Sequence, residues 1–344
     1  EILFPSSYPY TSSTTKILRD NFSELSNEVD ELIKLDKKKL VCDIGSNDGN
    51  LLTYFLEKSK VVGITPEDIG NKAIEKGIPT IIDYFNKESC KKIIKNFGNP
   101  DVITATNVFA HIDNPNEVMG NISNLLKKDG LFIVEVHYLK SLIESNQYDT
   151  IYHEHMRYYS LECLNNLLSS HGFKIFNAKL INTHGGSIRV FASRSNEYKV
   201  SNSFKQILEK EQEFLYKENN LFSYKDIVQK QKTELLQTLI DLKNKNKTIF
   251  GIGAPSRGTT LMNFCGIDSS LVSYICEIKG SHKIGKFLPG SSIPVLDEEI
   301  LFKEQPDYVL LLSWHISKEL INNLKKKGLK SKFIIPLPNV LIID

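Results

Sequence analysis

The chain has 344 residues, of which 41% are hydrophobic and 24% charged, and its formal net charge is +2. This composition is ordinary for a globular protein, and the length favours two domains. A net charge so near zero argues against nucleic-acid binding through phosphate neutralisation. No apolar stretch reaches about 18 residues, so no membrane span is expected, and no charged-then-apolar leader opens the sequence.

The five cysteines are scattered along the chain and form neither a C-x-x-C pair nor a zinc spacing with histidine. Such a set is typical of reduced thiols, so we expect a cytoplasmic protein. Cys42 and Cys265 lie in apolar runs and are interpreted as packing residues.

An irregular arm over residues 1–14 precedes a helical pattern over Thr15–Leu35. The arm carries Tyr8 and Tyr10 among Pro, Ser and Thr. These tyrosines are either packing or surface residues, or they line a binding site, since aromatic side chains commonly do so.

The next stretch reads as a strand over Lys39–Ile44, a glycine turn and a helical start, which is the first unit of a nucleotide-binding α/β domain. The turn has the spacing Gly-x-x-x-Gly rather than G-x-G-x-x-G, so no diphosphate cradle is indicated. This form is seen with S-adenosylmethionine, whose amino-acid end needs backbone groups and a carboxylate. The candidates are Asp43, Gly45, Asn47 and Gly49. The alternative is a tight turn without a ligand.

Alternating strand and helix patterns continue the domain, and they place strands at Lys60–Thr65, Thr80–Ile82, Asp101–Ala105 and Leu131–Val136, with helices at Asn71–Glu75 and Glu117–Leu126. The carboxyl ends of such strands bind ligands. Further cofactor candidates at this edge are Thr65, Asp83, Asn107, Phe109 and His111. Thr65 stands where an acidic ribose ligand is usual, with Glu67 and Asp68 just beyond. His111 is equally well read as a helix-start or packing histidine.

The stretch Ile151–Ser160 is the densest in groups that move protons, with two imidazoles, one carboxylate and three phenols. Histidine titrates near neutral pH and serves readily as a general base. The catalytic candidates are Tyr152, Glu154 and His155. The alternatives are a histidine satisfied within the fold and a metal pair with His153, for which no further ligand set is apparent.

A helix over Ser160–Ser170 and two strands, Lys174–Leu180 and Ser187–Ser193, close the first domain near residue 195 as an antiparallel pair. The turn between these strands and the strand that follows it supply four substrate candidates, namely His184, Gly185, Gly186 and Arg189. We interpret them as substrate contacts through exposed backbone N–H groups; the alternative is ordinary turn chemistry.

One or two long helices with a break near Asn219–Asn220 are expected from Ser203 to about Asn246. A second α/β unit then begins with a strand at Lys247–Gly251, a glycine loop and a helix through Cys265. Its later elements are strands at Leu271–Glu277, Tyr308–Trp314 and Lys332–Ile335 and a helix at Lys318–Lys327. Arg257 in the glycine loop suits a phosphate. The predicted domains are therefore 15–195, the helical linker 196–246 and 247–344, after the arm 1–14.

Together these stretches resemble the S-adenosylmethionine-dependent C-methyltransferases that act at C-3 of nucleotide-linked 4-keto-6-deoxy sugars. The resemblance runs from about Tyr8 to the C-terminus. It is carried by Tyr8-Pro9-Tyr10, Asp43–Gly49, Tyr152–His155, His184–Arg189, Gly251–Ala254, Lys283–Gly290 and Pro306-Asp307-Tyr308 with Trp314.

The resemblance implies a class I methyltransferase Rossmann-like domain followed by a smaller Rossmann-like α/β domain that binds the nucleotide sugar, with dTDP favoured. It implies His155 as the base that forms an enolate, Tyr152 as a positioning residue, Glu154 as the group that orients an imidazole, and Lys286 as a substrate contact. A monomer or homodimer is expected. The family's N-terminal cysteine-built zinc domain is not in this sequence, so zinc is not expected here.

Three positions depart from the family pattern, namely Thr65, Arg257 where Lys is common, and His315 where Asn is common. Two other functions stay open. One is sugar O-methylation on the same scaffold, and the other is a nucleotide-sugar-binding protein without catalysis.

Overall fold

The computed structural model describes residues 15–217 and 219–344, which divide into two compact units. Unit 1 comprises the described residues up to Ser141 together with His153–Lys217. Unit 2 comprises Leu142–Tyr152 together with the described residues from 219 onward. The short segment Leu142–Tyr152 thus belongs to unit 2 although both of its chain neighbours belong to unit 1. The predicted domain borders did not include this excursion.

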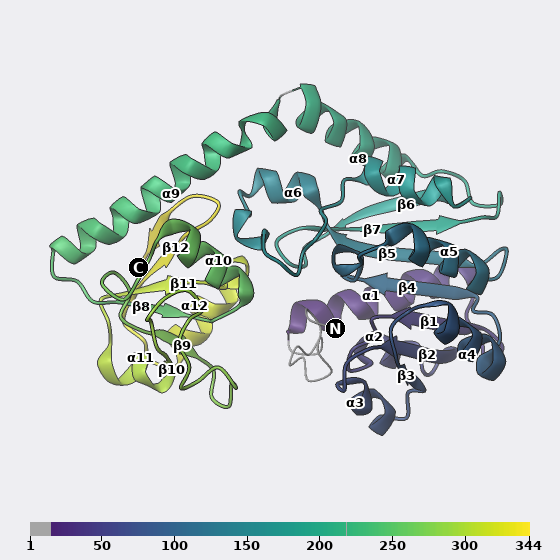
Figure 1. Cartoon of the computed structure of the whole chain (residues 1–344), viewed down its shortest axis with the longest axis horizontal. Coiled ribbons are helices and arrows are strands. Elements are labelled where there is room, and N and C mark those ends of the chain that lie inside the picture. Colours follow the sequence, from purple (N-terminus) through teal and green to yellow (C-terminus); the bar gives the residue numbers. More distant parts are fainter. Residues whose placement is uncertain (1–14, 218) are drawn as a thin grey trace. The chain divides into compact units, whose positions relative to one another are not determined.

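Unit 1 is built on a seven-stranded sheet in the order β3-β2-β1-β4-β5-β7-β6 (Figure 1). The first five strands pair in parallel, and β7 runs antiparallel between β5 and β6. The sequence prediction of a parallel sheet closed by an antiparallel pair is confirmed. The strands are β1 Leu40–Ile44, β2 Lys60–Thr65, β3 Thr80–Ile82, β4 Val102–Thr106, β5 Leu131–His137, β6 Lys174–Ile181 and β7 Ser187–Ser193.

Helices cover both faces of this sheet because successive residues of each buried strand point to opposite sides. Cys42 and Ile44 belong to a core with α4, α5, α7 and α8, while Val41 joins a second core with α1, α2 and α3. The helices are α1 Lys16–Ile33, α2 Asn50–Thr53, α3 Gly70–Glu75, α4 Lys87–Phe97, α5 Pro115–Leu125, α7 Leu161–Ser170 and α8 Asn202–Gln212. A short helix, α6 Leu139–Glu144, spans the border to unit 2.

Unit 2 contains a second sheet, in the order β10-β9-β8-β11-β12-β13, with only β13 antiparallel. Its strands are β8 Ile249–Ile252, β9 Ile275–Glu277, β10 Val295–Asp297, β11 Tyr308–Leu311, β12 Lys332–Ile335 and β13 Leu341–Ile343. Its helices are α9 Asn220–Asn244, α10 Ser256–Cys265, α11 Glu299–Glu304 and α12 Ser317–Lys326. The two sheets confirm the predicted fold class.

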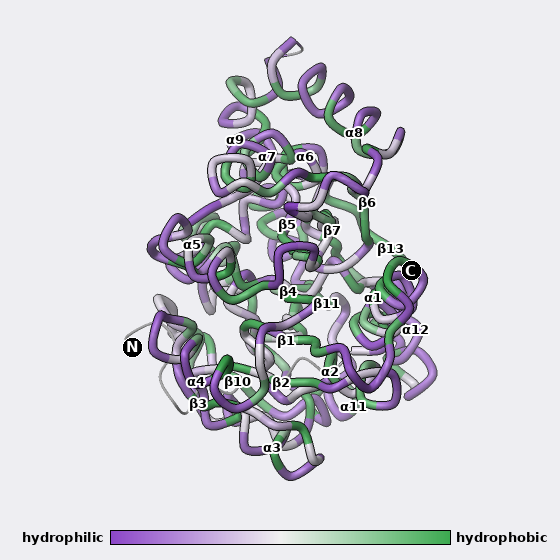
Figure 2. The backbone as a smooth tube through the Cα atoms, turned by 90° about the vertical axis from the view of Figure 1, so that its right-hand side faces the viewer, coloured by the Kyte–Doolittle hydropathy of each residue, from purple (hydrophilic) through white to green (hydrophobic). Residues whose placement is uncertain are grey.

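The predicted helix break is confirmed, because a π-helical turn at Glu213–Lys217 ends the α8 helix and α9 begins only at Asn220. Asn219 has φ 55°, a left-handed conformation that interrupts the helix. Figure 2 shows alternating hydrophilic and hydrophobic residues along α8. Within residues 15–217 and 219–344, none of the helices combines the length and hydropathy that a membrane crossing requires.

The strand predicted at Leu271–Glu277 is wrong over its first half. The N–H groups of Leu271 and Val272 both donate to the carbonyl of Asp268, which makes a turn there, and β9 starts only at Ile275. Helices α4 and α11 and strand β10 were not predicted. Helix α11 and strand β10 are too short to show a clear hydrophobic period. Helix α4 is amphipathic, with Cys90 and Ile93 on its buried face, so its period was present in the sequence but was missed.

Candidate active site

The glycine turn after β1 has the form of a ligand cradle. Gly45 and Gly49 have φ of 72° and 74°, which side chains rarely adopt. A Cβ at Gly45 would lie 2.4 Å from Val108 Cγ2. Ser46 Oγ and Asn50 Oδ1 are buried and find no hydrogen-bond partner among the described residues. A polar ligand at this turn would satisfy them, so the turn fits the amino-acid end of S-adenosylmethionine.

Asp43 lies beneath this turn and is 2% exposed, and its Oδ1 accepts a 2.6 Å hydrogen bond from Thr104 Oγ1. Burial raises the pKa of the Asp43 carboxyl to about 7, and the nearby Glu135 adds to the shift. The sequence predicted direct contact with the cofactor. With 2% exposure the carboxyl is little accessible for direct contact, so a role toward a cationic ligand would be electrostatic, through a medium of low dielectric constant.

The edge beside β2 offers a carboxylate that the sequence analysis noted but did not count among the cofactor candidates. Thr65 is 1% exposed, and its hydroxyl donates to Glu67, which is half-buried. Asp83 follows β3 and pairs with Lys92 at 2.9 Å. Thr65 is therefore less accessible than predicted, and Glu67 supplies an acidic group at the end of β2. Its position two residues beyond a strand end was the available signal.

The loop after β4 carries two cofactor candidates that differ in exposure, Asn107 and Phe109. Asn107 is half-buried with φ 58°, and its N–H donates to the Glu135 carbonyl at 2.8 Å. Phe109 is fully buried, with its ring centroid 5.9 Å from that of Phe132 and 6.3 Å from that of Tyr159. The Phe109 ring therefore belongs to the core and does not bind the cofactor, while a contact of Phe109 through its backbone stays a prediction.

The same loop holds the stretch that contains the catalytic candidates through a series of hydrogen bonds. His111 Nδ1 is 2.7 Å from the Glu154 carbonyl, and the Met156 N–H donates to the Ala110 carbonyl at 2.9 Å. Arg157 donates through its guanidinium to the carbonyls of residues 112 and 113. The Glu154–Arg157 stretch thereby lies at the end of β4, next to β1 in the sheet.

His155 is half-buried within this arrangement and has two aromatic neighbours. Its ring centroid lies 5.2 Å from that of His111 and 6.3 Å from that of Tyr158. Burial lowers the pKa of His111, which favours the neutral imidazole. Glu154 is 9% exposed. Tyr152, the last residue of the Leu142–Tyr152 segment of unit 2, is half-buried. The structure thus brings together His155, His111 and the Glu154 carbonyl in unit 1.

The turn His184-Gly185-Gly186 is half-buried and needs its second glycine. Gly186 has φ 118°, and a Cβ there would lie 2.6 Å from Ser141 Cβ. Its N–H donates to the Thr183 carbonyl at 2.9 Å. The Gly186 N–H is therefore used inside the turn, and the predicted substrate contact through it is wrong. For His184 and Gly185 the contact stays a prediction.

Arg189 is fully buried, so the predicted substrate contact is wrong for this residue. Its Nε donates to Glu135 at 2.6 Å, its Nη1 to Glu28, and its Nη2 to Asn21 Oδ1 at 2.8 Å. Two of these partners lie on α1, and Glu135 is directly opposite Arg189 in the β5–β7 ladder. Arg189 therefore fastens the α1 helix to the sheet.

In unit 2, Arg257 is 8% exposed and forms an ion pair with Asp149, so its guanidinium is engaged within the chain, and its role as a phosphate ligand stays a prediction. Lys286 is exposed. Tyr8 and Tyr10 lie outside the described residues. Over residues 15–217 and 219–344, no group of three or more His, Cys, Asp or Glu side chains could hold a metal ion.

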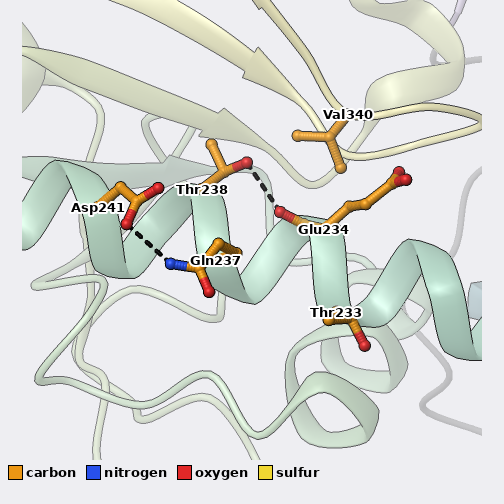
Figure 3. Close-up of a pocket in the computed structure, with 6 residues that line it drawn as sticks. All are labelled: Thr233, Glu234, Gln237, Thr238, Asp241 and Val340. Carbon is orange, nitrogen blue, oxygen red and sulfur yellow. Dashed lines mark hydrogen bonds between the residues drawn. The ribbon is translucent and has the colours of Figure 1, made fainter.

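A depression of about 470 Å³ lies along α9 (Figure 3). Two of its polar groups are already bonded within the helix, since Gln237 donates to Asp241 and Thr238 to the Glu234 carbonyl. It is lined by Thr233, Glu234, Gln237, Thr238, Asp241 and Val340. Because none of these six side chains is a usual nucleophile or base near neutral pH, apart from ordinary surface carboxylates, we do not regard it as the active site.

Residues 17–177 match a family model described as a methyltransferase domain, and residues 182–338 match one described as a C-methyltransferase C-terminal domain. The chain is 33% identical to the C-methyltransferase NovU of Streptomyces niveus over 98% of its own length and 81% of the relative's.

Two solved structures illustrate the weaker structural likeness. Magnesium protoporphyrin IX methyltransferase of Synechocystis PCC 6803 shares 13% identity at a TM-score of 0.41, covering 54% of this chain and 90% of that one. An S-adenosylmethionine-dependent methyltransferase of Clostridium acetobutylicum shares 15% identity at a TM-score of 0.40, covering 53% and 93%.

Proposed function

The chain belongs to the C-methyltransferase family and is an S-adenosylmethionine-dependent enzyme, and from this premise we propose that it methylates C-3 of a nucleotide-linked 4-keto-6-deoxy sugar, with dTDP as the nucleotide. The observation that carries the proposal is His155, a half-buried imidazole held beside His111 by the loop after β4. The adjacent strand β1 ends in the cofactor cradle.

His155 is the general base of the proposed reaction. The 4-keto group acidifies the hydrogen on C-3, so a neutral imidazole can remove it and leave an enolate whose C-3 is nucleophilic. A positioned base contributes about 10²–10⁴-fold to the rate. When bound, S-adenosylmethionine supplies an electrophilic sulfonium methyl group. Gly45, Asn47, Glu67 and Asn107 would hold it.

Tyr152, which is half-buried, and Glu154, which is buried, have different proposed roles. Tyr152 positions the reactants, and Glu154 orients an imidazole. The Glu154 carbonyl bonded to His111 fixes the backbone just before the base. Holding the base and the reacting carbon near contact supplies much of the remaining acceleration.

Product analysis tests this function. The enzyme, S-adenosylmethionine and a dTDP-4-keto-6-deoxy sugar should give a product whose new methyl group is bonded to carbon, as seen by its NMR shift and its coupling to C-3. A methyl group on oxygen would contradict the proposal and identify a sugar O-methyltransferase.

We expect the affinity for S-adenosylmethionine to rise between pH 6 and pH 8, by up to about tenfold per pH unit below the pKa of Asp43. The reason is that the cationic ligand favours the ionised carboxylate, whose pKa in the free protein is about 7. Calorimetric titration at several pH values measures this. In Asp43→Asn the affinity should be weaker and flat with pH; a pH dependence that survives in this variant would contradict the assignment.

Although Asp43→Asn should weaken cofactor binding, the same substitution should raise the folding stability of the protein above pH 7. Between the unfolded value of 3.8 and the folded value of about 7, folded Asp43 binds more protons than unfolded Asp43. Wild-type stability is therefore lost as the pH rises through this window. Asp43→Asn removes the buried charge, so its melting temperature should exceed that of the wild type at pH 8 and not at pH 4.

We expect His111→Phe to lower kcat about tenfold or more while the Kd for S-adenosylmethionine stays the same. The phenyl ring keeps the packing against His155 but removes the hydrogen bond to the Glu154 carbonyl, and a misplaced catalytic group costs rate rather than affinity. His111→Asn, whose amide can donate in place of Nδ1, should recover part of the loss. A weaker Kd with an unchanged kcat would instead make His111 a cofactor ligand, as its sequence position suggested.

A further inference from the structure

The sheet of unit 2 has a position where α/β proteins usually bind ligands. Its chain order runs from β8 to β9 and β10 on one side and then to β11 and β12 on the other. The strand order therefore reverses between β8 and β11, and the crevice at their carboxyl ends is the expected ligand position. The glycine loop, the start of α10 and Trp314 follow these two strands.

Asp149 of the same unit occupies this position. Its two carboxylate oxygens accept hydrogen bonds from Arg257, Oδ2 from Nε at 2.8 Å and Oδ1 from Nη2 at 2.9 Å. Oδ2 also accepts a bond from the Trp314 indole at 2.7 Å. Asp149 is fully buried. A carboxylate with a two-point guanidinium contact and an indole donor is held as an anionic ligand would be.

The other groups at this ligand position of unit 2 also contact residues of the chain itself. The Arg257 guanidinium lies 4.8 Å from the Trp314 ring and makes a second contact with Gln147 Oε1 at 3.3 Å. The Ala254 N–H of the glycine loop donates to Glu277 at 2.6 Å. A phosphate at this position would have to displace two carboxylates that are already hydrogen-bonded.

The residues on either side of Asp149 are anchored in the same unit. Tyr148 is 5% exposed, and its hydroxyl donates to Gln231 at 2.5 Å and lies 3.4 Å from Cys265 Sγ. Its ring centroid is 5.1 Å from that of Phe264. Thr150 is also buried. The whole turn Tyr148–Thr150 is therefore fixed in unit 2, and only four residues separate Thr150 from His155.

We propose that Asp149 fills the ligand position of unit 2 from within the chain, and that this ion pair is a positioning device that holds the segment leading to Tyr152 and His155 for catalysis. Unit 2 then does not bind the substrate's phosphates through Arg257. The part of the inference that concerns rate rests on the proposed function, whereas the filled ligand position does not.

The first test is hydrogen–deuterium exchange of the whole protein, read on peptides that cover residues 142–156. In Asp149→Asn, exchange there should be faster than in the wild type, because the Arg257 guanidinium loses its ionic partner. Trp314→Phe, which removes one donor, should have a smaller effect in the same direction. Lys279→Gln, which breaks an exposed pair with Glu299 in the same unit, is the control and should leave this segment unchanged. Unchanged exchange in both test variants would overturn the proposal.

The second test separates positioning from phosphate binding. Asp149→Asn should lower kcat for methyl transfer by about 10²-fold, as misplacement of a catalytic group does, with an unchanged Kd for S-adenosylmethionine. Calorimetry with dTDP should give the same Kd for Arg257→Gln and the wild type. A dTDP affinity lost in Arg257→Gln would make Arg257 a phosphate ligand and overturn the proposal. If the wild type failed to C-methylate, the proposed function would fall while the exchange result would still decide the filled site.

Discussion

Replacing His155 with Asn should lower kcat for C-methylation by about 10²–10⁴-fold, the usual contribution of a positioned general base, and leave the Kd for S-adenosylmethionine unchanged. The amide cannot take the C-3 proton, so enolate formation is slowed by the loss of the base. The cofactor cradle lies on a different loop, after β1, and keeps its glycine geometry. Steady-state kinetics and calorimetric titration of the same preparation measure the two quantities.

The matched control for this substitution is His153→Asn, two residues earlier in the same stretch. His153 is exposed, whereas His155 is half-buried beside His111. The control should keep most of its activity. Full activity in His155→Asn, or an equal loss in both variants, would mean that His155 is not the base.

Arg189→Met should lower the free energy of unfolding by about 3–5 kcal/mol, because it leaves a buried carboxylate without its partner. Glu135 is fully buried and accepts from Arg189 Nε at 2.6 Å and from Asn21 at 2.9 Å. Denaturation by urea, followed by circular dichroism, measures the loss. Lys16→Gln, which breaks an exposed pair on the same α1 helix, should stay within about 0.5 kcal/mol of the wild type.

The loss in Arg189→Met should also depend on pH. Burial already raises the pKa of Glu135, and the Arg189 charge opposes that shift. Without Arg189 the folded carboxyl holds its proton to still higher pH, so the variant loses stability as the pH rises above the unfolded value of Glu135. Adding Glu135→Leu should recover much of the loss, since an apolar pair often replaces a buried ion pair at little cost.

If Arg189→Met were as stable as the wild type but had a raised KM for the sugar nucleotide, Arg189 would be a substrate contact, as the sequence suggested. The full burial of Arg189 predicts the reverse.

The sequence predicted the strands of unit 1 well because each buried strand is a short apolar run ended by polar or glycine residues. Strands β2, β3 and β7 begin and end at the predicted residues. The glycine turn after β1 was predictable for a local reason, since positive φ at two nearby positions calls for glycine. These features depend on neighbours in the chain.

The features that the sequence did not reveal are contacts with partners that are distant in sequence. Arg189 looked like a site residue because it follows a glycine pair, yet its partner Glu135 lies on another strand and Glu28 on the first helix. Arg257 looked like a phosphate ligand because its loop has the right glycines, yet Asp149 reaches it from another segment. Spacing reveals which groups a loop exposes locally, but it does not reveal which buried charges neutralise them.

The most direct test of the central claim is proton NMR of a dTDP-4-keto-6-deoxy sugar in D₂O with the wild-type enzyme, with and without S-adenosylmethionine. We predict loss of the C-3 proton signal, its persistence with His155→Asn, and a new methyl group on carbon when the cofactor is added. Retention of the C-3 proton in the wild type, while a methyl group appears on oxygen, would contradict base catalysis by His155 at C-3.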